Sequence, residues 1–260
     1  MANALPGRNE IIDSYIARFR EDSRVRALWL EGADGLGVED EYSDLDLWLD
    51  ALDENITDVL EDAIALAESW GPLDTCDRVP HADGVILQAN VHVSGMSPYL
   101  TLDLCVQKHS RVATGCCVYR AGDIAELPKV LFDKDNIIRL VEPEPLDMAS
   151  LRKIKETACQ RFAQRGRVTK YIARGKYLET LSHYDEYVLE PLVILARLIH
   201  TPEHTEYGWT HISRHLPEEL VQQLEGLRCH RELSDMGVLL VQADRLYGEL
   251  NREFEDKYDR

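Results

Sequence analysis

The spacing of apolar residues divides the chain into a first part of mixed helices and strands and a second part dominated by helices. Residues 8–21 place isoleucine, tyrosine and phenylalanine at helical spacing, which predicts an amphipathic helix. Residues 44–49 alternate leucine with acidic and aromatic residues, the period-two pattern of a strand. Another helix is predicted over residues 56–70, where Gly71 and Pro72 end it.

Further sheet is predicted before the pattern changes. Two strand-like runs, 85–93 and 100–106, are separated by a short segment containing serine, glycine and proline, and they predict a hairpin. Short additional strands are expected at 116–119 and 130–132. From about Leu146 onward the periodicity is helical and strand signals are few.

Strands followed by helices predict an α+β fold of two domains, for which 260 residues are sufficient. A small mixed-sheet catalytic domain is expected over residues 1–145, and an all-helical domain that clamps substrate or nucleotide over residues 146–260. The stretch 192–199 is apolar nearly all round and predicts a central helix, which Pro191 either begins or kinks.

Charge and composition narrow the classes of partner. The net charge of −18 argues against a protein that coats nucleic acid, and it suits a cationic small molecule. No apolar run is long enough to span a bilayer, and no leader-like segment is recognised at the start, so no membrane partner and a cytoplasmic location are expected. Six cysteines without a disulfide-scaffold spacing fit a reducing compartment.

The feature that indicates chemistry is a pair of acids on the strand 44–49. Asp44 and Asp46 are two residues apart, so a strand presents both carboxylates on one face. Like charges so close repel unless a cation lies between them, and oxygen ligands favour hard ions such as Mg²⁺. Asp103 is an acid in the next apolar strand, where it could complete a triad holding one or two metal ions.

Two neighbouring features suit a phosphorylated ligand. Glycine-rich backbone precedes the acid pair and can approach phosphates closely, offering N–H groups. A later helical segment carries nine basic residues and one acid between Arg152 and Lys176. Three of those basic residues are predicted to share one helical face: Arg167, Lys170 and Arg174. A solvated helix face is the alternative interpretation of this run. An acid triad, a phosphate-binding backbone and a basic clamp are the parts that phosphoryl and nucleotidyl transfer require.

These residues resemble a known signature. The run 28–35, Leu-Trp-Leu-Glu-Gly-Ala-Asp-Gly, followed by 42–47, Tyr-Ser-Asp-Leu-Asp-Leu, resembles that of the polymerase-beta-like nucleotidyltransferase superfamily. That signature is a Gly-Ser turn, then Asp-x-Asp on a strand, then a third acid on a later strand, which Asp103 resembles. Within the superfamily the chain looks most like the antibiotic nucleotidyltransferases of the aminoglycoside and lincosamide kinds.

The resemblance implies roles for the acids. Asp44 and Asp46 would bind two magnesium ions, and Asp103 would ligand the catalytic metal, act as general base on the acceptor hydroxyl, or do both. In some relatives the base is a glutamate of the helical domain. Glu186 and Glu190, four residues apart on one predicted helical face, are the candidates for that role here.

The resemblance also implies a nucleotide site. Gly32, Ala33 and Ser43 would contact the triphosphate of ATP or another nucleoside triphosphate, with Lys170 and Arg174 supplying positive charge. One departure is clear, because Ala33 stands where the family has its turn serine. The backbone amide remains available, and Ser43 or the basic helix could assist.

The resulting hypothesis is transfer of a nucleoside monophosphate, AMP from ATP, onto a hydroxyl of a small cationic acceptor such as an aminoglycoside antibiotic. One alternative is transfer onto a protein or a tRNA, as in toxin-like members, although the net acidity disfavours nucleic acid. Another is a nucleotide-binding regulator with weak or absent catalysis, which Ala33 favours. A homodimer is compatible with this reading, because a partner's helical domain could complete an acidic cleft.

Overall fold

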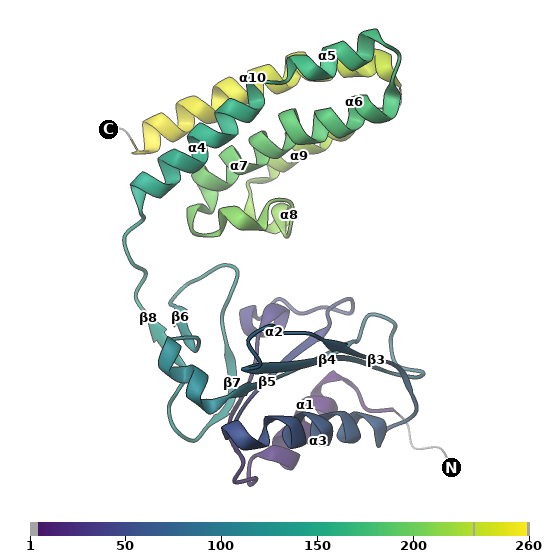
Figure 1. Cartoon of the computed structure of the whole chain (residues 1–260), viewed down its shortest axis with the longest axis vertical. Coiled ribbons are helices and arrows are strands. Elements are labelled where there is room, and N and C mark those ends of the chain that lie inside the picture. Colours follow the sequence, from purple (N-terminus) through teal and green to yellow (C-terminus); the bar gives the residue numbers. More distant parts are fainter. Residues whose placement is uncertain (1–4, 231, 259–260) are drawn as a thin grey trace. The chain divides into compact units, whose positions relative to one another are not determined.

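The computed structural model describes residues 5–230 and 232–258 of the chain (Figure 1). Its contacts divide the chain into two compact units, Met1–Pro143 and Glu144–Arg260. The first unit contains a mixed sheet with helices and the second is helical, which confirms the predicted α+β class. The separate functions assigned to residues 1–145 and 146–260 stay predictions.

The elements of the first unit follow the predicted order with additions. In chain order they are α1 (Arg8–Phe19), β1 (Val25–Leu30), α2 (Gly32–Leu36), β2 (Leu45–Ala51), η1 (Asp53–Asn55), α3 (Ile56–Glu68), β3 (Leu73–Val79), β4 (Ile86–Val93), β5 (Leu102–Lys108), η2 (His109–Thr114), β6 (Val118–Arg120), β7 (Lys129–Asp133) and β8 (Arg139–Val141). The expected hairpin is confirmed, because β4 and β5 pair antiparallel. The glycine-rich segment forms the short helix α2.

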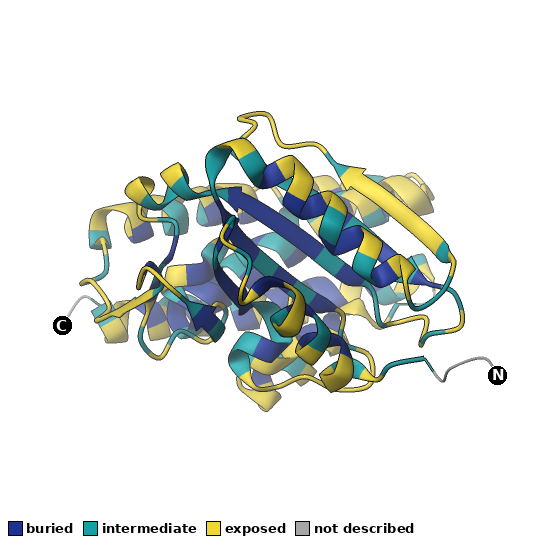
Figure 2. Ribbon diagram, turned by 90° about the horizontal axis from the view of Figure 1, so that it is seen from below, coloured by how far each residue is buried: buried dark blue, intermediate teal, exposed yellow. Residues whose placement is uncertain are grey.

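In the described part of the chain, six strands form one mixed sheet in the order β3-β4-β5-β2-β1-β7. β2 and β5 are parallel neighbours at its centre, whereas the other described pairs of this sheet are antiparallel. β6 and β8 pair in parallel beside it. β3 lies at one edge and is largely exposed, in contrast to the dark central strands in Figure 2.

Helices α1 and α3 cover one face of the sheet. Leu45, Leu47 and Leu49 alternate along β2 and are fully buried in the core that these helices close. On α1, Tyr15 packs into the same core and donates its hydroxyl to the carbonyl of Ala63 at 2.9 Å. The alternation of β2 therefore sends its leucines into this core and its remaining residues to the opposite face.

The second unit is built from helices around an apolar centre. Its elements are α4 (Met148–Phe162), α5 (Gly166–Ala173), α6 (Tyr177–Tyr184), η3 (Asp185–Leu189), α7 (Glu190–His200), η4 (Pro202–Tyr207), α8 (Ile212–His215), α9 (Glu218–Arg228) and α10 (Leu233–Tyr258). The predicted central helix is α7, which packs against both α4 and α10. None of the described helices is long and apolar enough to cross a bilayer.

Pro191 lies in the first turn of α7, directly after one turn of π-helix, η3. Proline has no N–H to donate, so it breaks the regular hydrogen-bond ladder of a continuous helix. A π-turn inserts one residue into that ladder. Pro191 therefore lies within the first turn of α7, as expected for a proline at the start of a helix, and the π-turn η3 lies between α6 and α7.

Gly35 of α2 provides a stability test of the first unit. A Cβ at this position would overlap the carbonyl oxygen of Leu127, so the backbone of that loop lies directly against α2. We expect Gly35→Ala to lower the free energy of unfolding by about 1–3 kcal/mol. Chemical denaturation measures the difference. Gly226→Ala in α9, where the added methyl meets open space, is the control and is expected to stabilise slightly.

Candidate active site

Two of the three predicted acids lie side by side on the central parallel strands. Asp46 of β2 and Asp103 of β5 are register partners, and both side chains are partly exposed. Partners in register on neighbouring strands point to the same face of the sheet. This face lies opposite the α1 and α3 core. Asp44 precedes β2 by one residue and is exposed, so it lies outside the strand on which it was expected.

Gly32 leaves the space that the carboxylate of Asp46 occupies. A Cβ on Gly32 would overlap Asp46 Oδ2, and the backbone of Gly32 has a φ of +56°. Both facts require glycine, because a side chain would collide with the carboxylate and would rarely adopt this φ. The backbone N–H of Glu31 also donates to the carbonyl oxygen of Asp46 at 3.1 Å. The start of α2 therefore lies directly against β2 at the acid.

The pKa of the Asp46 carboxyl is strongly raised. Burial raises the pKa of Asp46 to about 7, with further contributions from the charges of Asp44, Asp103, Glu31 and Asp34. The carboxyl is therefore poised to gain or lose a proton near neutral pH. Perturbation by burial and by specific charge partners is frequent at catalytic positions.

The carboxylate of Asp103 is held by Gln88 of β4. Gln88 Nε2 donates to both oxygens of Asp103, at 2.7 and 2.8 Å. The side-chain carbonyl of Gln88 is itself within 2.7 Å of His81 Nε2. Sequence reasoning missed Gln88, although an amide within the apolar run 85–93 is a signal that could have drawn attention to it.

Glu31 is a second residue that sequence reasoning did not select. It precedes α2 and accepts hydrogen bonds from Trp29 Nε1 at 2.9 Å and from the Tyr119 hydroxyl. Burial raises the pKa of Glu31. The ring of Trp29 stacks on Trp48 with centroids 5.8 Å apart. Two stacked aromatic rings and a partly buried acid thus lie on the face that carries Asp46.

Arg8 of α1 ties α2 to the segment before β2. Its guanidinium forms an ion pair with Asp34 of α2, whose side chain is 2% exposed. The same group donates to the carbonyl oxygens of Ser43, at 2.9 Å, and of Asp44. Arg8 is therefore a positioning residue for the chain that leads into Asp46.

Ala33 replaces the family's serine and Ser43 was expected to assist it. Ala33 lies in α2 and Ser43 lies in the turn before β2. Ala33 is the second residue of α2, where the first amides of a helix have no partner within the helix. The Ser43 hydroxyl donates to Asp40 Oδ1 at 2.9 Å and closes a turn before β2. Contact of Gly32, Ala33 or Ser43 with a nucleotide stays a prediction.

The remaining predicted residues belong to the helical unit. Lys170 in α5 and Arg174 at its end are exposed, and Arg167 lies over the ring of Tyr187 at 5.3 Å. Glu186 in η3 hydrogen-bonds the same tyrosine and so raises the pKa of Tyr187. The second unit thus brings Arg167 and Glu186 together at Tyr187. Participation of Lys170, Arg174 and Glu186 in catalysis stays a prediction.

Glu190, the other candidate for the general base, is paired with a basic side chain. It begins α7 and forms an ion pair with Arg161 at 2.9 Å. Glu186 lies 4.0 Å from His183 Nδ1. Glu186 is therefore the less strongly paired of the two acids proposed as an alternative base.

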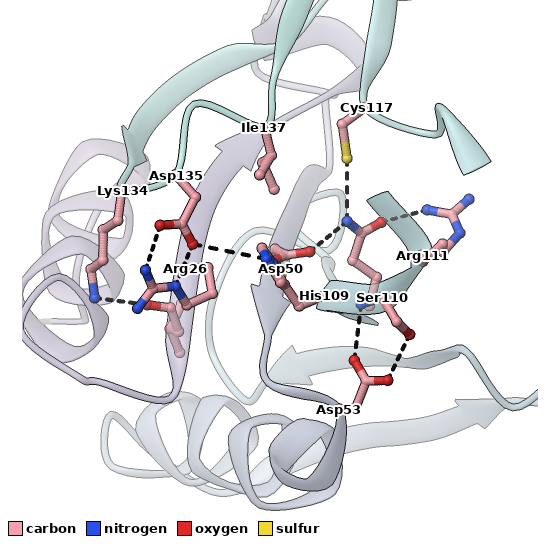
Figure 3. A network of polar contacts seen from close by, with 12 residues as sticks. Arg26, Asp50, Asp53, His109, Ser110, Arg111, Cys117, Lys134, Asp135 and Ile137 are labelled. Atoms are coloured by element: carbon pink, nitrogen blue, oxygen red, sulfur yellow. Dashed lines mark hydrogen bonds and ion pairs between the residues drawn. The ribbon is translucent and has the colours of Figure 1, made fainter. Parts of the chain in front are cut away.

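A second acid of β2, Asp50, has a structural environment (Figure 3). It is fully buried and accepts from Gln107 Nε2 at 2.8 Å and from His109 Nδ1 at 2.6 Å. His109 also approaches Asp135, which pairs with Arg26. These contacts join β1, β2 and η2 to the loop after β7, so we interpret this cluster as a support for the sheet.

The donor chemistry of the Asp46–Asp103 pair fits a hard divalent cation. Both side chains offer only oxygen, and their mutual repulsion contributes to the raised pKa of Asp46. Across residues 5–230 and 232–258, however, no three histidine, cysteine, aspartate or glutamate side chains are gathered closely enough to hold a metal ion. The triad of Asp44, Asp46 and Asp103 as a metal site stays a prediction.

Comparison with known proteins gives structural similarity only. No family of sequences and no curated protein matches the chain. The chain is similar to nucleotidyltransferases. An aminoglycoside 6-adenyltransferase from Bacillus subtilis is 16% identical, with 97% of this chain and 91% of that chain covered and a TM-score of 0.41.

Two further solved structures are similar at lower identity. A spectinomycin adenyltransferase from Enterococcus faecialis, solved with ATP and spectinomycin, is 9% identical over 94% of this chain and 100% of that one, with a TM-score of 0.33. A nucleotidyltransferase-like protein from Exiguobacterium sibiricum is 10% identical over 96% and 78%, with a TM-score of 0.34.

The Arg8–Asp34 pair allows a double-mutant test of the anchor. Arg8→Ala leaves Asp34 buried with Lys129 at 3.8 Å, and we expect it to lower the free energy of unfolding by about 3 kcal/mol. Adding Asp34→Ala removes the uncompensated charge and should recover part of that loss. Urea denaturation of the four proteins measures the coupling; additive effects of the two changes would contradict an interacting pair.

The pKa of Asp46 predicts how stability depends on pH in metal-free buffer. The folded protein keeps this proton up to a pKa of about 7, whereas the unfolded chain releases it near the ordinary 3.8. The stability contribution is therefore complete below pH 4 and is lost as the pH rises through 7.

Asp46→Asn removes this titration. We expect the variant to exceed the wild type in free energy of unfolding by about 1–2 kcal/mol at pH 8, after allowance for partial solvent exposure. The advantage should fade toward pH 4. Denaturation in EDTA at several pH values measures it, with Asp58→Asn on the exposed side of α3 as control. An advantage that is constant with pH would show that Asp46 does not titrate as stated.

Proposed function

We propose that the chain is a magnesium-dependent nucleotidyltransferase that moves AMP from ATP onto a hydroxyl of a small cationic acceptor, such as an aminoglycoside. The observation that supports it best is the pairing of Asp46 with Asp103 in register on parallel strands, with Gly32 backbone against Asp46. Two carboxylates beside close-approaching backbone suit a phosphate ester and a reacting hydroxyl.

The proposed reaction forms one phosphorus–oxygen bond and breaks another. The acceptor hydroxyl oxygen attacks the α-phosphorus of ATP, and the bond from that phosphorus to the bridging oxygen of pyrophosphate breaks. Asp103, oriented by Gln88, takes the hydroxyl proton, and pyrophosphate leaves. Glu186 is the alternative base, as the sequence resemblance suggests.

The acids also define where a cation would bind. Asp46 and Asp103 would hold it, with Asp44 as a third carboxylate. When bound, a magnesium ion would stabilise negative charge on the transferring phosphate and lower the pKa of the attacking hydroxyl. Burial and neighbouring charge raise the pKa of Asp46 to about 7, and a bound cation would favour the ionised form of this carboxyl.

A second candidate is a nucleotide-binding regulator. Ala33 is the observation that favours it, since the resemblance implies a serine here whose hydroxyl would bind a triphosphate oxygen, and alanine has no hydroxyl. The register of Asp46 and Asp103 opposes it. A regulator would bind ATP and release no pyrophosphate with any acceptor.

Pyrophosphate release with Mg²⁺, each nucleoside triphosphate and a panel of aminoglycosides and lincosamides tests the proposal. We expect acceptor-dependent release that Asp46→Asn abolishes and that Asp103→Asn lowers by about 10²–10⁴-fold in kcat. Asp58→Asn should retain full activity. Magnesium chloride at pH 8 should raise the Tm of the wild type and leave that of Asp46→Asn unchanged.

The outcomes separate the candidates. Tight ATP binding without release would support the regulator and count against transfer to these antibiotics. Release that survives Asp103→Asn but is lost in Glu186→Gln would move the general base to the helical unit. Release that persists in Asp46→Asn would contradict the assignment of the site.

A further inference from the structure

A cleft of about 570 Å³ lies beside the starts of β2 and β5. This volume falls within the range of small-molecule sites. Its lining comes from α1, from the turn before β2 and from the turn before β5: Arg8, Asp40, Glu41, Tyr42, Ser43, Ser97, Tyr99 and Leu100. Every one of these residues belongs to the first unit.

Hydrogen bonds fix both turns that form the walls. Asp40 Oδ1 accepts the backbone N–H of Tyr42 at 3.0 Å. Ser97 Oγ accepts the backbone N–H of Tyr99 at 3.4 Å. Such side-chain bonds to the backbone two residues on are characteristic of tight turns. These hydrogen bonds hold the backbone at both tyrosines in a turn, so a ligand that contacts the tyrosines costs less conformational entropy.

Both tyrosines are largely exposed. Tyr42 is 61% exposed and Tyr99 is 52% exposed, although their rings touch edge to face with centroids 5.0 Å apart. Paired rings at a cleft offer apolar faces to a sugar ring and negative π-surfaces to a cation. A buried structural role does not account for such exposure.

The position of the tyrosines relates the cleft to the acids. Tyr42 is four residues before Asp46, and Tyr99 is four residues before Asp103, and the two acids are register partners. Both tyrosines lie in turns that lead into the strands, so each is separated from its acid by at most the span of four extended residues, about 13 Å. A molecule of two or three linked rings that contacts the tyrosines could therefore present a hydroxyl to the acids.

The charges of the lining favour a cation over a phosphate. The guanidinium of Arg8 is engaged by Asp34 and by two backbone carbonyls, which leaves little of its charge for an anion. Asp40 and Glu41 are exposed carboxylates. Hydrogen bonds from the Ser43 hydroxyl and the backbone hold the pKa of Asp40 below its usual value, so it is ionised at neutral pH.

We propose that this cleft is the acceptor subsite, and that Tyr42, Tyr99 and Glu41 select a polyhydroxylated ring system bearing ammonium groups, of the aminocyclitol class. The proposal rests on the proposed function, since it supplies the acceptor whose hydroxyl meets Asp46 and Asp103. The tyrosine rings bind the ammonium-bearing face and the carboxylates of the cleft neutralise its charge.

Direct binding tests the subsite without catalysis. Calorimetric titration of the full chain in EDTA, without nucleotide, uses kanamycin, streptomycin and spectinomycin. Fully N-acetylated kanamycin keeps the rings but loses the ammonium charges. We expect at least one of the three antibiotics to bind and, if kanamycin binds, its acetylated form not to bind. Binding by none of the three, or binding of kanamycin that its acetylated form equals, overturns the proposal.

Variants assign the binding to the cleft. Tyr42→Ala and Tyr99→Ala should each raise Kd about 5-fold or more, whereas Tyr99→Phe stays within about 2-fold because the ring remains. Glu41→Gln should weaken binding and Glu54→Gln, an exposed acid of η1, should not. Unchanged Kd in both alanine variants overturns the proposal. Thermal unfolding confirms that each variant is folded.

The same variants keep this inference separate from the transfer reaction. Binding that depends on both tyrosines, together with no pyrophosphate release, supports the subsite and contradicts the proposed function. Release whose KM for acceptor is unchanged in Tyr42→Ala and Tyr99→Ala supports the function and overturns the subsite. A rise in KM with little change in kcat is the result expected if both are correct.

Discussion

The parallel pairing of β2 with β5 is the constraint on which the site depends. Backbone hydrogen bonds between these strands set Asp46 opposite Asp103, and the alternation of β2 sends its leucines into the core behind them. A shift of one residue would turn every side chain of a strand to the other face. The burial of those leucines therefore fixes the position of the acids as firmly as it fixes the core.

Placing Asp46 beside Asp103 lowers the stability of the fold, and neighbouring residues accommodate the two carboxylates. Burial and like charge disfavour the ionised form of Asp46. Gly32 removes a side chain that would occupy the same space, while Gln88 donates two hydrogen bonds to Asp103. Arg8 fixes the entering chain. Strain of this kind is expected where a sequence serves a site as well as a fold.

The periodicity of apolar residues correctly predicted a strand, a hairpin and a central helix. The alternation at 44–49, the hairpin of β4 and β5 and the apolar helix α7 all appear in the structure. The helix α2 was not predicted from the glycines of its segment. Its close approach to Leu127 and to β2 involves residues that are distant in sequence or on another element.

The contacts that complete the site depend on residues distant in sequence. Arg8 and Asp34 are 26 positions apart, and Gln88 and Asp103 are 15 apart on paired strands. Spacing alone carries no sign of such pairs, since any arginine and any aspartate could form one. The register of β2 against β5, which brings Asp46 to Asp103, is likewise set by packing of the whole sheet and not by either strand alone.

The exposed strand β3 limits how copies of this chain could associate. An edge strand can add a further strand through its free backbone groups unless charged side chains discourage it. β3 carries Asp74, Asp77 and Arg78, and the last pairs with Glu61 of α3 at 2.8 Å. An approaching strand would have to desolvate these charges. Continuous sheets built across two copies are therefore disfavoured at this edge, and a homodimer would form more readily through another surface.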